Sequence, residues 1–145
     1  MLVIFDLDET LIFTQNDHIL VRPYAYTLIS KLLKHVDVGI WSAGSEDYVM
    51  NVLRSRFEVF IPNFVFIKTR NYCDFYENSL IKPIQKIWNE YPKYNQSNTL
   101  IIEDTLSNCI FNRRNAIIVP KFKGNHDTVL NDIKSVIYQF FNQST

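Results

Sequence analysis

Met1-Leu-Val-Ile-Phe-Asp6-Leu-Asp8-Glu-Thr10 opens the chain with an apolar run that ends in two aspartates and a threonine. Residues 2–5 have the continuous apolar character of a strand buried on both faces of a parallel sheet. If the extended geometry persists to Asp8, the Asp6 and Asp8 side chains point to the same side, because side chains alternate along a strand. Neighbouring carboxylates repel each other unless a cation lies between them, and open α/β sheets bind ligands at the carboxyl ends of their strands. The segment therefore predicts a site that handles a hard metal ion and phosphate.

This segment has two other interpretations. A DxDxT pattern also arises by chance in a turn after a strand, so the motif depends on its context. A calcium-binding loop would need Gly at its sixth position and a carboxylate such as Glu at its twelfth. Leu11 and Asp17 stand at those positions, and the motif follows a strand rather than a helix. The calcium loop is therefore disfavoured.

The composition limits the class of protein. With 145 residues, of which 47% are hydrophobic, the chain is predicted to be a single folded domain spanning residues 1–145. Its net charge of zero gives no general attraction to nucleic acid or to an anionic membrane, so neither is expected as a stable partner. No signal peptide or membrane span is predicted. The two cysteines are too few for a disulfide framework, which favours an intracellular location, in cytoplasm or nucleus.

Strand-like and helix-like segments alternate along the chain, which is typical of a parallel α/β sheet. The predicted strands are 2–5, 38–41, 64–67, 100–102 and 116–119. Helices are predicted to begin at Arg22-Pro23, after an N-cap at Ser45 and after Lys82-Pro83, with a last helix at 127–141. Residues 11–21 are predicted to form a loop or a small hairpin, and residues 68–79 an irregular polar stretch. Because parallel crossovers are right-handed, the predicted fold is an α/β, doubly wound, mainly parallel sheet.

A second acidic pair, Glu103-Asp104, follows the fourth predicted strand as Asp6 follows the first. Mg²⁺ prefers oxygen ligands, usually one or two carboxylates with water and substrate phosphate. Carboxylates from two strand ends that meet in one crevice would supply them. The alternative is that Asp104 caps a short helix from Leu106, where its charge would favour the helix dipole.

Three further residues are candidates for binding phosphate. Ser42 lies between a buried strand and a helix, where its hydroxyl and nearby N–H groups could hold a phosphoryl oxygen, although an ordinary turn serine fits as well. Lys82 could neutralise the charge of carboxylates and phosphate, or extend along the surface. Arg70 could add a bidentate phosphate contact from its loop, or remain solvated.

The remaining polar residues give weaker indications. No shared spacing of the three histidines suggests a zinc site or a catalytic triad. The Arg113-Arg114 pair and the Lys121 to Lys123 segment are weakly basic. They could touch an anionic substrate, but a solvated loop is the simpler interpretation.

The chain resembles the haloacid-dehalogenase superfamily, in the DxDxT form found in carboxyl-terminal-domain phosphatases. Asp6-Leu-Asp8-Glu-Thr10 resembles its motif I, and Ser42 stands where its second motif usually has Thr. Lys82, preceded by Arg70-Asn-Tyr-Cys73, matches motif III, and Glu103-Asp104 matches motif IV. Motif IV usually begins with Asp, so the longer Glu103 leaves open which of the two acids is the main metal ligand. Residues 64–79 leave little room for the insert sheet that larger relatives carry between the second and third motifs, so a minimal cap domain or none is expected.

The resemblance implies a magnesium-dependent phosphomonoester hydrolase. Asp6 would attack phosphorus and become an aspartyl-phosphate, Asp8 would act as general acid and base, and Thr10 would orient the loop. Metal ligands would come from Asp6, the Asp8 carbonyl, Glu103 and Asp104, whereas Ser42, Arg70 and Lys82 would bind substrate phosphate. The implied substrate is phosphoserine or phosphothreonine in a protein or peptide. A phosphatase for nucleotides or nucleic-acid ends, and a binding module that has lost catalysis, are the alternatives.

Overall fold

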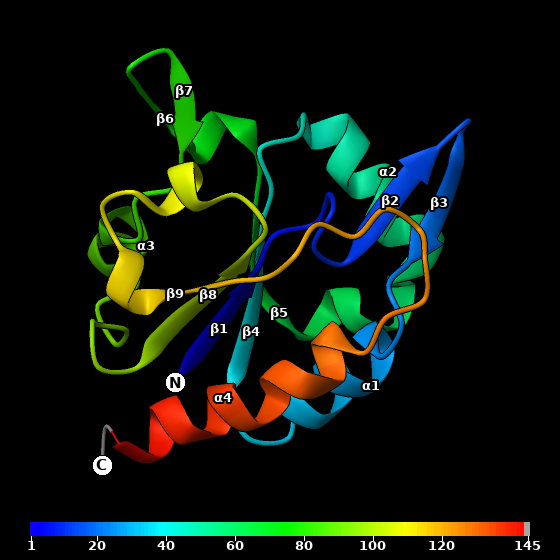
Figure 1. Cartoon of the computed structure of the whole chain (residues 1–145). Coiled ribbons are helices and arrows are strands. Elements are labelled where there is room, and N and C mark those ends of the chain that lie inside the picture. Colours follow the sequence, from blue (N-terminus) through cyan, green and yellow to red (C-terminus); the bar gives the residue numbers. More distant parts are fainter. Residues whose placement is uncertain (144–145) are drawn as a thin grey trace.

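The structure, a computed structural model, describes residues 1–143, and five parallel strands form its central sheet (Figure 1). The strands are β1 (Leu2–Phe5), β4 (Asp37–Trp41), β5 (Phe64–Lys68), β8 (Thr99–Glu103) and β9 (Ala116–Ile118). Their order across the sheet is β5-β4-β1-β8-β9. The chain therefore builds outward from β1 in one direction and then in the other, and such a reversal creates a ligand-binding crevice at the carboxyl ends of the strands.

The register of the sheet brings the two acidic motifs together. Leu2 pairs with Thr99 of β8, and Phe5 pairs with Ile102. The Asp6 N–H continues this ladder by donating to the Ile102 carbonyl at 3.1 Å. Asp6 therefore lies beside Glu103 at the same edge of the sheet.

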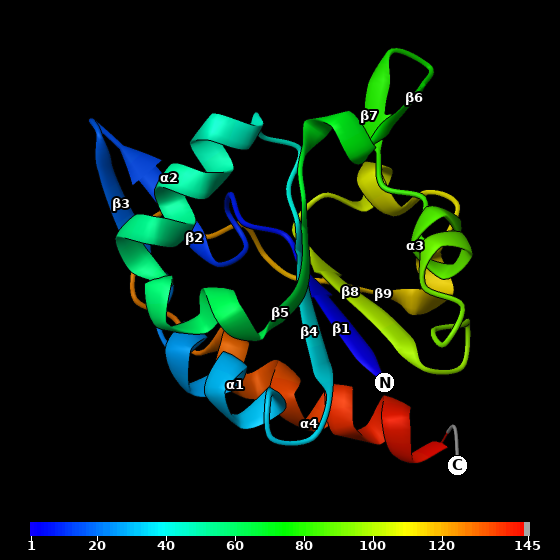
Figure 2. The ribbon, with the colours of Figure 1, turned by 180° about the vertical axis from the view of Figure 1, so that it is seen from behind.

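Helices cover both faces of the sheet, and both views show helices on the two opposite sides of the strands (Figures 1 and 2). Val3 and Phe5 belong to a large core cluster with α1 (Ala25–Leu32), α2 (Glu46–Arg56) and α4 (Val129–Gln143). Leu2 and Ile4 belong to a smaller cluster with α3 (Gln85–Glu90) on the other face. Alternate residues of β1 thus pack on alternate faces, and the predicted doubly wound, mainly parallel α/β fold is confirmed.

Two β-hairpins lie outside the central sheet. β2 (Ile12–Gln15) and β3 (His18–Val21) form the small hairpin that was one of the two expectations for residues 11–21. Its turn residues, Asn16 and Asp17, have φ of 50° and 65°. Positive φ at both central positions is what a tight two-residue hairpin requires, and Asn and Asp tolerate it well.

The second hairpin corrects the prediction of an irregular stretch at residues 68–79. β6 (Asp74–Tyr76) and β7 (Ser79–Ile81) pair around a turn with positive φ at Glu77 and Asn78. A short 3-10 helix, η2 (Arg70–Tyr72), precedes them. Apart from η2, this hairpin is the only secondary structure between β5 and α3 in the described chain. The insertion is therefore small, in keeping with a minimal cap.

The first helix begins later than predicted. Tyr24 has a φ of 70°, outside the helical region, so α1 starts at Ala25 rather than at Arg22-Pro23. Other short 3-10 helices are η1 (Glu58–Asn63), η3 (Leu106–Cys109) and η4 (Arg113–Asn115). None of the helices within residues 1–143 is both long enough and apolar enough to cross a bilayer.

Candidate active site

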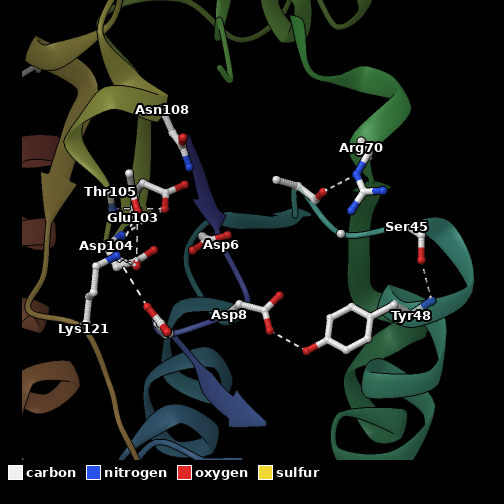
Figure 3. A pocket seen from close by; sticks show the side chains of 13 residues that line it. Asp6, Asp8, Ser45, Tyr48, Arg70, Glu103, Asp104, Thr105, Asn108 and Lys121 are labelled. Atoms are coloured by element: carbon white, nitrogen blue, oxygen red, sulfur yellow. Dashed lines mark hydrogen bonds and ion pairs between the residues drawn. The ribbon is translucent and has the colours of Figure 1, made fainter. Parts of the chain in front are cut away.

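A pocket of about 440 Å³ opens at the carboxyl ends of β1, β4 and β8 (Figure 3). It is lined by residues at or after the carboxyl ends of all five strands: Asp6, Asp8, Glu9, Ala43, Gly44, Ser45, Tyr48, Arg70, Glu103, Asp104, Thr105, Asn108 and Lys121. Both acidic motifs of the sequence therefore face one cavity.

Asp6 is held at both of its carboxylate oxygens. The Thr10 hydroxyl donates to Oδ2 at 2.9 Å, and the Lys82 ammonium donates to Oδ1 at 2.8 Å. Burial, which leaves only 5% of the residue exposed, raises the pKa of the Asp6 carboxyl well above its ordinary value. The Lys82 charge opposes this rise, and the nearby Glu103 adds to it. A further cation in the pocket would keep Asp6 ionised.

Lys82 is a buried cation between two acids. Its Nζ lies 2.8 Å from Asp6 Oδ1 and 2.7 Å from Glu103 Oε2. Burial alone would lower the pKa of Lys82, but the charges and hydrogen bonds of the two acids outweigh it and raise the pKa, so the side chain stays charged. The lysine follows β7, and its backbone N–H donates to the Asn108 carbonyl at 2.8 Å. Its ammonium therefore lies beneath the pocket, in contact with Asp6.

Glu103 and Asp104 have different surroundings. Glu103 is fully buried; one oxygen accepts from Lys82, and the other accepts from the N–H groups of Asp104 and Thr105 at 3.1 and 3.3 Å. Asp104 accepts from Thr10 at 3.3 Å and from Lys121 at 2.6 Å. Burial alone would raise the pKa of Asp104, but hydrogen bonding from Glu103, Asp6 and Lys121 lowers it. No cap bond from Asp104 to η3 is formed, so the helix-cap interpretation is not supported in the described chain.

The acidic cluster fits a divalent cation. One ligand atom each of Asp6, Glu103 and Asp104 lies within 4.8 Å of the others. Hard cations such as Mg²⁺ take carboxylate oxygens and retain several waters. All three carboxylates accept hydrogen bonds at both oxygens, so an ion would replace or share some of these contacts. The Glu103 side chain is fully buried, whereas that of Asp104 keeps some exposure, so Asp104 is the more accessible ligand of the second acidic pair.

Asp8 contacts a tyrosine across the pocket. The Tyr48 hydroxyl donates to Asp8 Oδ1, and the Thr14 hydroxyl lies 2.9 Å from the same phenol oxygen. Burial raises the pKa of the Asp8 carboxyl, and the Tyr48 hydrogen bond only partly opposes it. Burial and the bond to Asp8 raise the pKa of Tyr48 to about 12, so the phenol remains a donor. A carboxyl group that holds its proton more readily than usual suits a general acid.

Ser42 and Arg70 flank the pocket in different ways. Ser42 is buried and accepts the Gly44 N–H at 3.0 Å, and it is not among the lining residues. The backbone after it, at Ala43 and Gly44, does line the pocket. Arg70 also lines it, with Nε donating to the Ala43 carbonyl at 3.0 Å (Figure 3). Arg70 therefore faces the pocket directly, whereas Ser42 lies behind the residues that line it.

Several contributors to the site were not predicted from the sequence. The sequence places Tyr48 only in the first turn of a helix, and it offers Lys121 as part of a weakly basic segment that could touch an anionic substrate or remain solvated. Arg22 is buried and donates to the carbonyls of Thr10 at 3.2 Å and Pro120 at 2.8 Å. Lys121 follows a strand end, as Asp6 does, so the rule that located the acids would also have located it.

Comparison with protein families gives one match over nearly the whole chain. The family described as NLI interacting factor-like phosphatase matches residues 1–144. Ubiquitin-like domain-containing CTD phosphatase 1 of Drosophila melanogaster is 25% identical over 142 residues, which cover 86% of this chain and 42% of that protein. The corresponding CTD phosphatase of Arabidopsis thaliana is 27% identical over 143 residues, with 86% and 40% covered. The chain thus spans about two fifths of the length of these curated relatives.

Solved structures show the same fold. The RNA polymerase II CTD phosphatase Fcp1 superposes with a TM-score of 0.66 at 15% identity, over 98% of this chain and 50% of that one. A fission yeast Fcp1 variant bound to beryllium fluoride gives a TM-score of 0.62 at 13% identity, over 99% and 51%. At these identities the likeness concerns the fold alone.

Proposed function

Because the chain belongs to the NLI interacting factor-like phosphatase family, we propose that it is a magnesium-dependent phosphomonoester hydrolase that acts on phosphoserine or phosphothreonine in proteins. The expected kinship with carboxyl-terminal-domain phosphatases is thereby confirmed. Residues 1–145 would act as one catalytic domain. Both cysteines are free thiols, which supports an intracellular, reducing compartment.

One observation supports this proposal above the others: Asp6 lies between a buried lysine and a second strand-end carboxylate. Lys82 contacts Asp6 at 2.8 Å, and oxygens of Asp6 and Asp104 lie within 4.8 Å of each other. A nucleophilic carboxylate needs neighbouring positive charge to approach an anionic phosphate ester. Lys82, and an ion on Asp6 and Asp104, would supply it.

The residues then have distinct roles. Asp6 attacks phosphorus, and the bond from phosphorus to the ester oxygen breaks while Asp8 donates a proton to that oxygen. Water next attacks the aspartyl-phosphate, Asp8 takes a proton from it, and inorganic phosphate leaves with Asp6 restored. Magnesium, when bound to Asp6, Asp104 and the Asp8 carbonyl, would offset the phosphate charge. Lys82 and Arg70 would stabilise the charge on the transferred group.

The openness of the site favours a protein substrate. The segment between β5 and α3 adds only the short helix η2 and the small β6–β7 hairpin within the described chain (Figure 1). An extended peptide can enter such a cleft, whereas a small metabolite gains more from enclosure. The curated relatives named above are CTD phosphatases, which supports the same substrate class.

A phosphopeptide panel tests the proposal. Phosphoserine and phosphothreonine peptides should be hydrolysed with magnesium, and a chelator should stop the reaction. Faster turnover of a 3′-phosphorylated oligonucleotide would instead favour the nucleic-acid-end phosphatase. Absence of magnesium-dependent hydrolysis of all these esters and of para-nitrophenyl phosphate would favour a binding module without catalysis.

The unequal surroundings of Glu103 and Asp104 give a test of the metal ligands. Asp104→Ala should raise the magnesium concentration for half-maximal turnover about tenfold or more, because the more accessible carboxylate of the second acidic pair is lost. Glu103→Gln should mainly lower thermal stability, because Lys82 loses an anionic partner. Magnesium titrations of turnover, together with melting curves without magnesium, check both. The reverse pattern would make Glu103 the main ligand.

Tyr48 should matter most when the leaving group needs a proton. Tyr48→Phe removes the hydrogen bond that orients Asp8, so kcat on a phosphoserine peptide should fall about tenfold. Hydrolysis of para-nitrophenyl phosphate should change little, because nitrophenolate leaves without protonation. Tyr26→Phe, which alters a tyrosine packed on Phe57 and Phe60, is the matched control. Equal losses on the two esters would contradict an orienting role.

A further inference from the structure

A second pocket, of about 430 Å³, lies between the start of α3 and the segment 110–115 that leads into β9. The two segments lie side by side in both views of the ribbon (Figures 1 and 2). None of the residues that line this pocket lines the active site. The cavity is therefore a separate feature of the surface.

The charged residues that line this pocket are all positive. Arg113 and Arg114 are its charged lining residues, and both are exposed. Among residues 1–143, no carboxylate forms an ion pair with either arginine, in contrast to Lys82, Lys86 and Lys121. Two exposed guanidinium groups beside a cavity without acidic lining attract anions, and carboxylates in particular can be bound in bidentate fashion.

A buried donor in the same pocket has no acceptor. Asn112 is 9% exposed, and its Oδ1 accepts the Ile84 N–H at 3.3 Å, which fixes the orientation of the amide. Its Nδ2 has no hydrogen-bond partner in the described structure. Buried polar groups are normally paired, and an unpaired one calls for an explanation such as a missing ligand. The nitrogen itself has almost no accessible surface, so an acceptor can reach it only after the side chains around it move.

The rest of the lining is apolar and aromatic. Phe111 is 61% exposed and meets the ring of Tyr76 edge-on, with centroids 4.9 Å apart. Trp88 is held in place because its Nε1 donates to Thr99 at 3.0 Å. Exposed aromatic surface beside arginines is the composition enriched at the centres of protein interfaces. Gln85 and Gln96 add amides that can pair with a peptide backbone.

We propose that this pocket is a docking site for a short acidic segment of a partner protein, with at least one apolar side chain between its carboxylates. The carboxylates would pair with Arg113 and Arg114, and the apolar side chain would pack on Phe111 and Trp88. The side-chain amides of Gln85 and Gln96 would pair with the peptide backbone. The site is independent of the hydrolytic reaction, since the two pockets share no residue.

Binding of a defined peptide tests this site. The probe is the peptide Gly-Glu-Phe-Glu-Leu-Gly, titrated into the ¹⁵N-labelled protein and followed by NMR, with Gly-Lys-Phe-Lys-Leu-Gly as its charge-reversed counterpart. The acidic peptide should shift the signals of residues 83–88 and 110–115, and the basic peptide should not. The double variant Arg113→Gln/Arg114→Gln should weaken binding about tenfold or more. Arg54→Gln/Arg56→Gln, which removes the same charge from α2, should leave binding unchanged.

The outcomes separate this site from the catalytic one. Hydrolysis of para-nitrophenyl phosphate should be the same in the Arg113→Gln/Arg114→Gln variant and in the unaltered protein, and a loss would show that the arginines serve the reaction instead. Equal binding of both peptides, or undiminished binding by the variant, would overturn the proposal. Shifts at 83–88 and 110–115 caused by inorganic phosphate or AMP, but not by the acidic peptide, would identify a small-anion site instead.

Discussion

Asp6→Asn is expected to lower phosphate-ester turnover about 10⁴-fold or more, because the amide cannot act as the attacking nucleophile. The fold should persist. An asparagine has the same shape, its oxygen can accept from Lys82, and its amide can donate to the Thr10 hydroxyl, so the present contacts at 2.8 and 2.9 Å can be kept. Burial raises the pKa of Asp6 because the ionised carboxylate loses its hydration in the folded protein. Replacing the carboxylate by an amide removes this desolvation cost from the free energy of folding. Turnover of para-nitrophenyl phosphate and a melting curve measure the two effects.

Asp17→Asn provides the matched control for this variant. Asp17 is exposed at the tip of the β2–β3 hairpin with a φ of 65°, a conformation that Asn adopts readily. This substitution should leave both turnover and stability unchanged. Substantial residual hydrolysis by Asp6→Asn, with the fold intact, would reject Asp6 as the nucleophile.

Lys82→Met is expected to reduce both activity and stability. The variant leaves Asp6 and Glu103 buried without the cation that now contacts them at 2.8 and 2.7 Å. Breaking a buried ion pair by removing one partner typically costs about 3–5 kcal/mol. Loss of the positive charge beside the transferred phosphoryl group should lower kcat about 10³-fold. Denaturant unfolding and turnover on a phosphopeptide give the two measurements.

The pH dependence of stability identifies the cause of the Lys82→Met defect. Burial already raises the pKa of Asp6 in the folded protein, and Lys82 opposes that rise, so the variant should have a still higher Asp6 pKa. A folded-state pKa above the unfolded value means that the folded protein binds more protons, so stability falls as pH rises from the ordinary aspartate range through the raised pKa. The variant should therefore lose more stability between acid and neutral pH than the unaltered protein does.

Lys86→Met is the control for Lys82→Met. Lys86 forms an exposed pair with Asp74 at 3.0 Å, and such surface pairs contribute about 0–1 kcal/mol. Its loss should alter neither turnover nor the pH dependence. If Lys82→Met resembled this control, the buried ion-pair network would not stabilise the site.

The fold was largely predictable because buried parallel strands appear in the sequence as short apolar runs. All five strands of the sheet were predicted to within about two residues. The β6–β7 hairpin was not, because Asp74-Phe-Tyr76 is exposed and its pairing depends on positive φ at Glu77 and Asn78. Local sequence also did not reveal that Tyr24 leaves the helical region and delays α1.

The residues of the candidate site that stand at or directly after the end of a strand could be predicted from the sequence. Asp6 and Glu103 lie side by side because β1 pairs with β8. Lys82, from a distant segment, was a candidate by its charge, and the resemblance favoured it over a lysine extended along the surface. Tyr48 and Lys121 meet their carboxylate partners only through tertiary packing, across 40 and 17 residues of sequence. A lone tyrosine in a helix or lysine in a loop carries no local sign of such a contact.

The buried guanidinium of Arg22 joins distant parts of the chain. It donates to Thr10 in the catalytic loop and to Pro120 after β9, and it pairs with Asp127 before α4, at 3.2, 2.8 and 3.2 Å. Pro120 and Asp127 stand 98 and 105 residues after Arg22 in the sequence. The order of the loop that carries Thr10 therefore depends on contacts that close only when distant segments meet, so this loop should become ordered together with the tertiary fold and not before it.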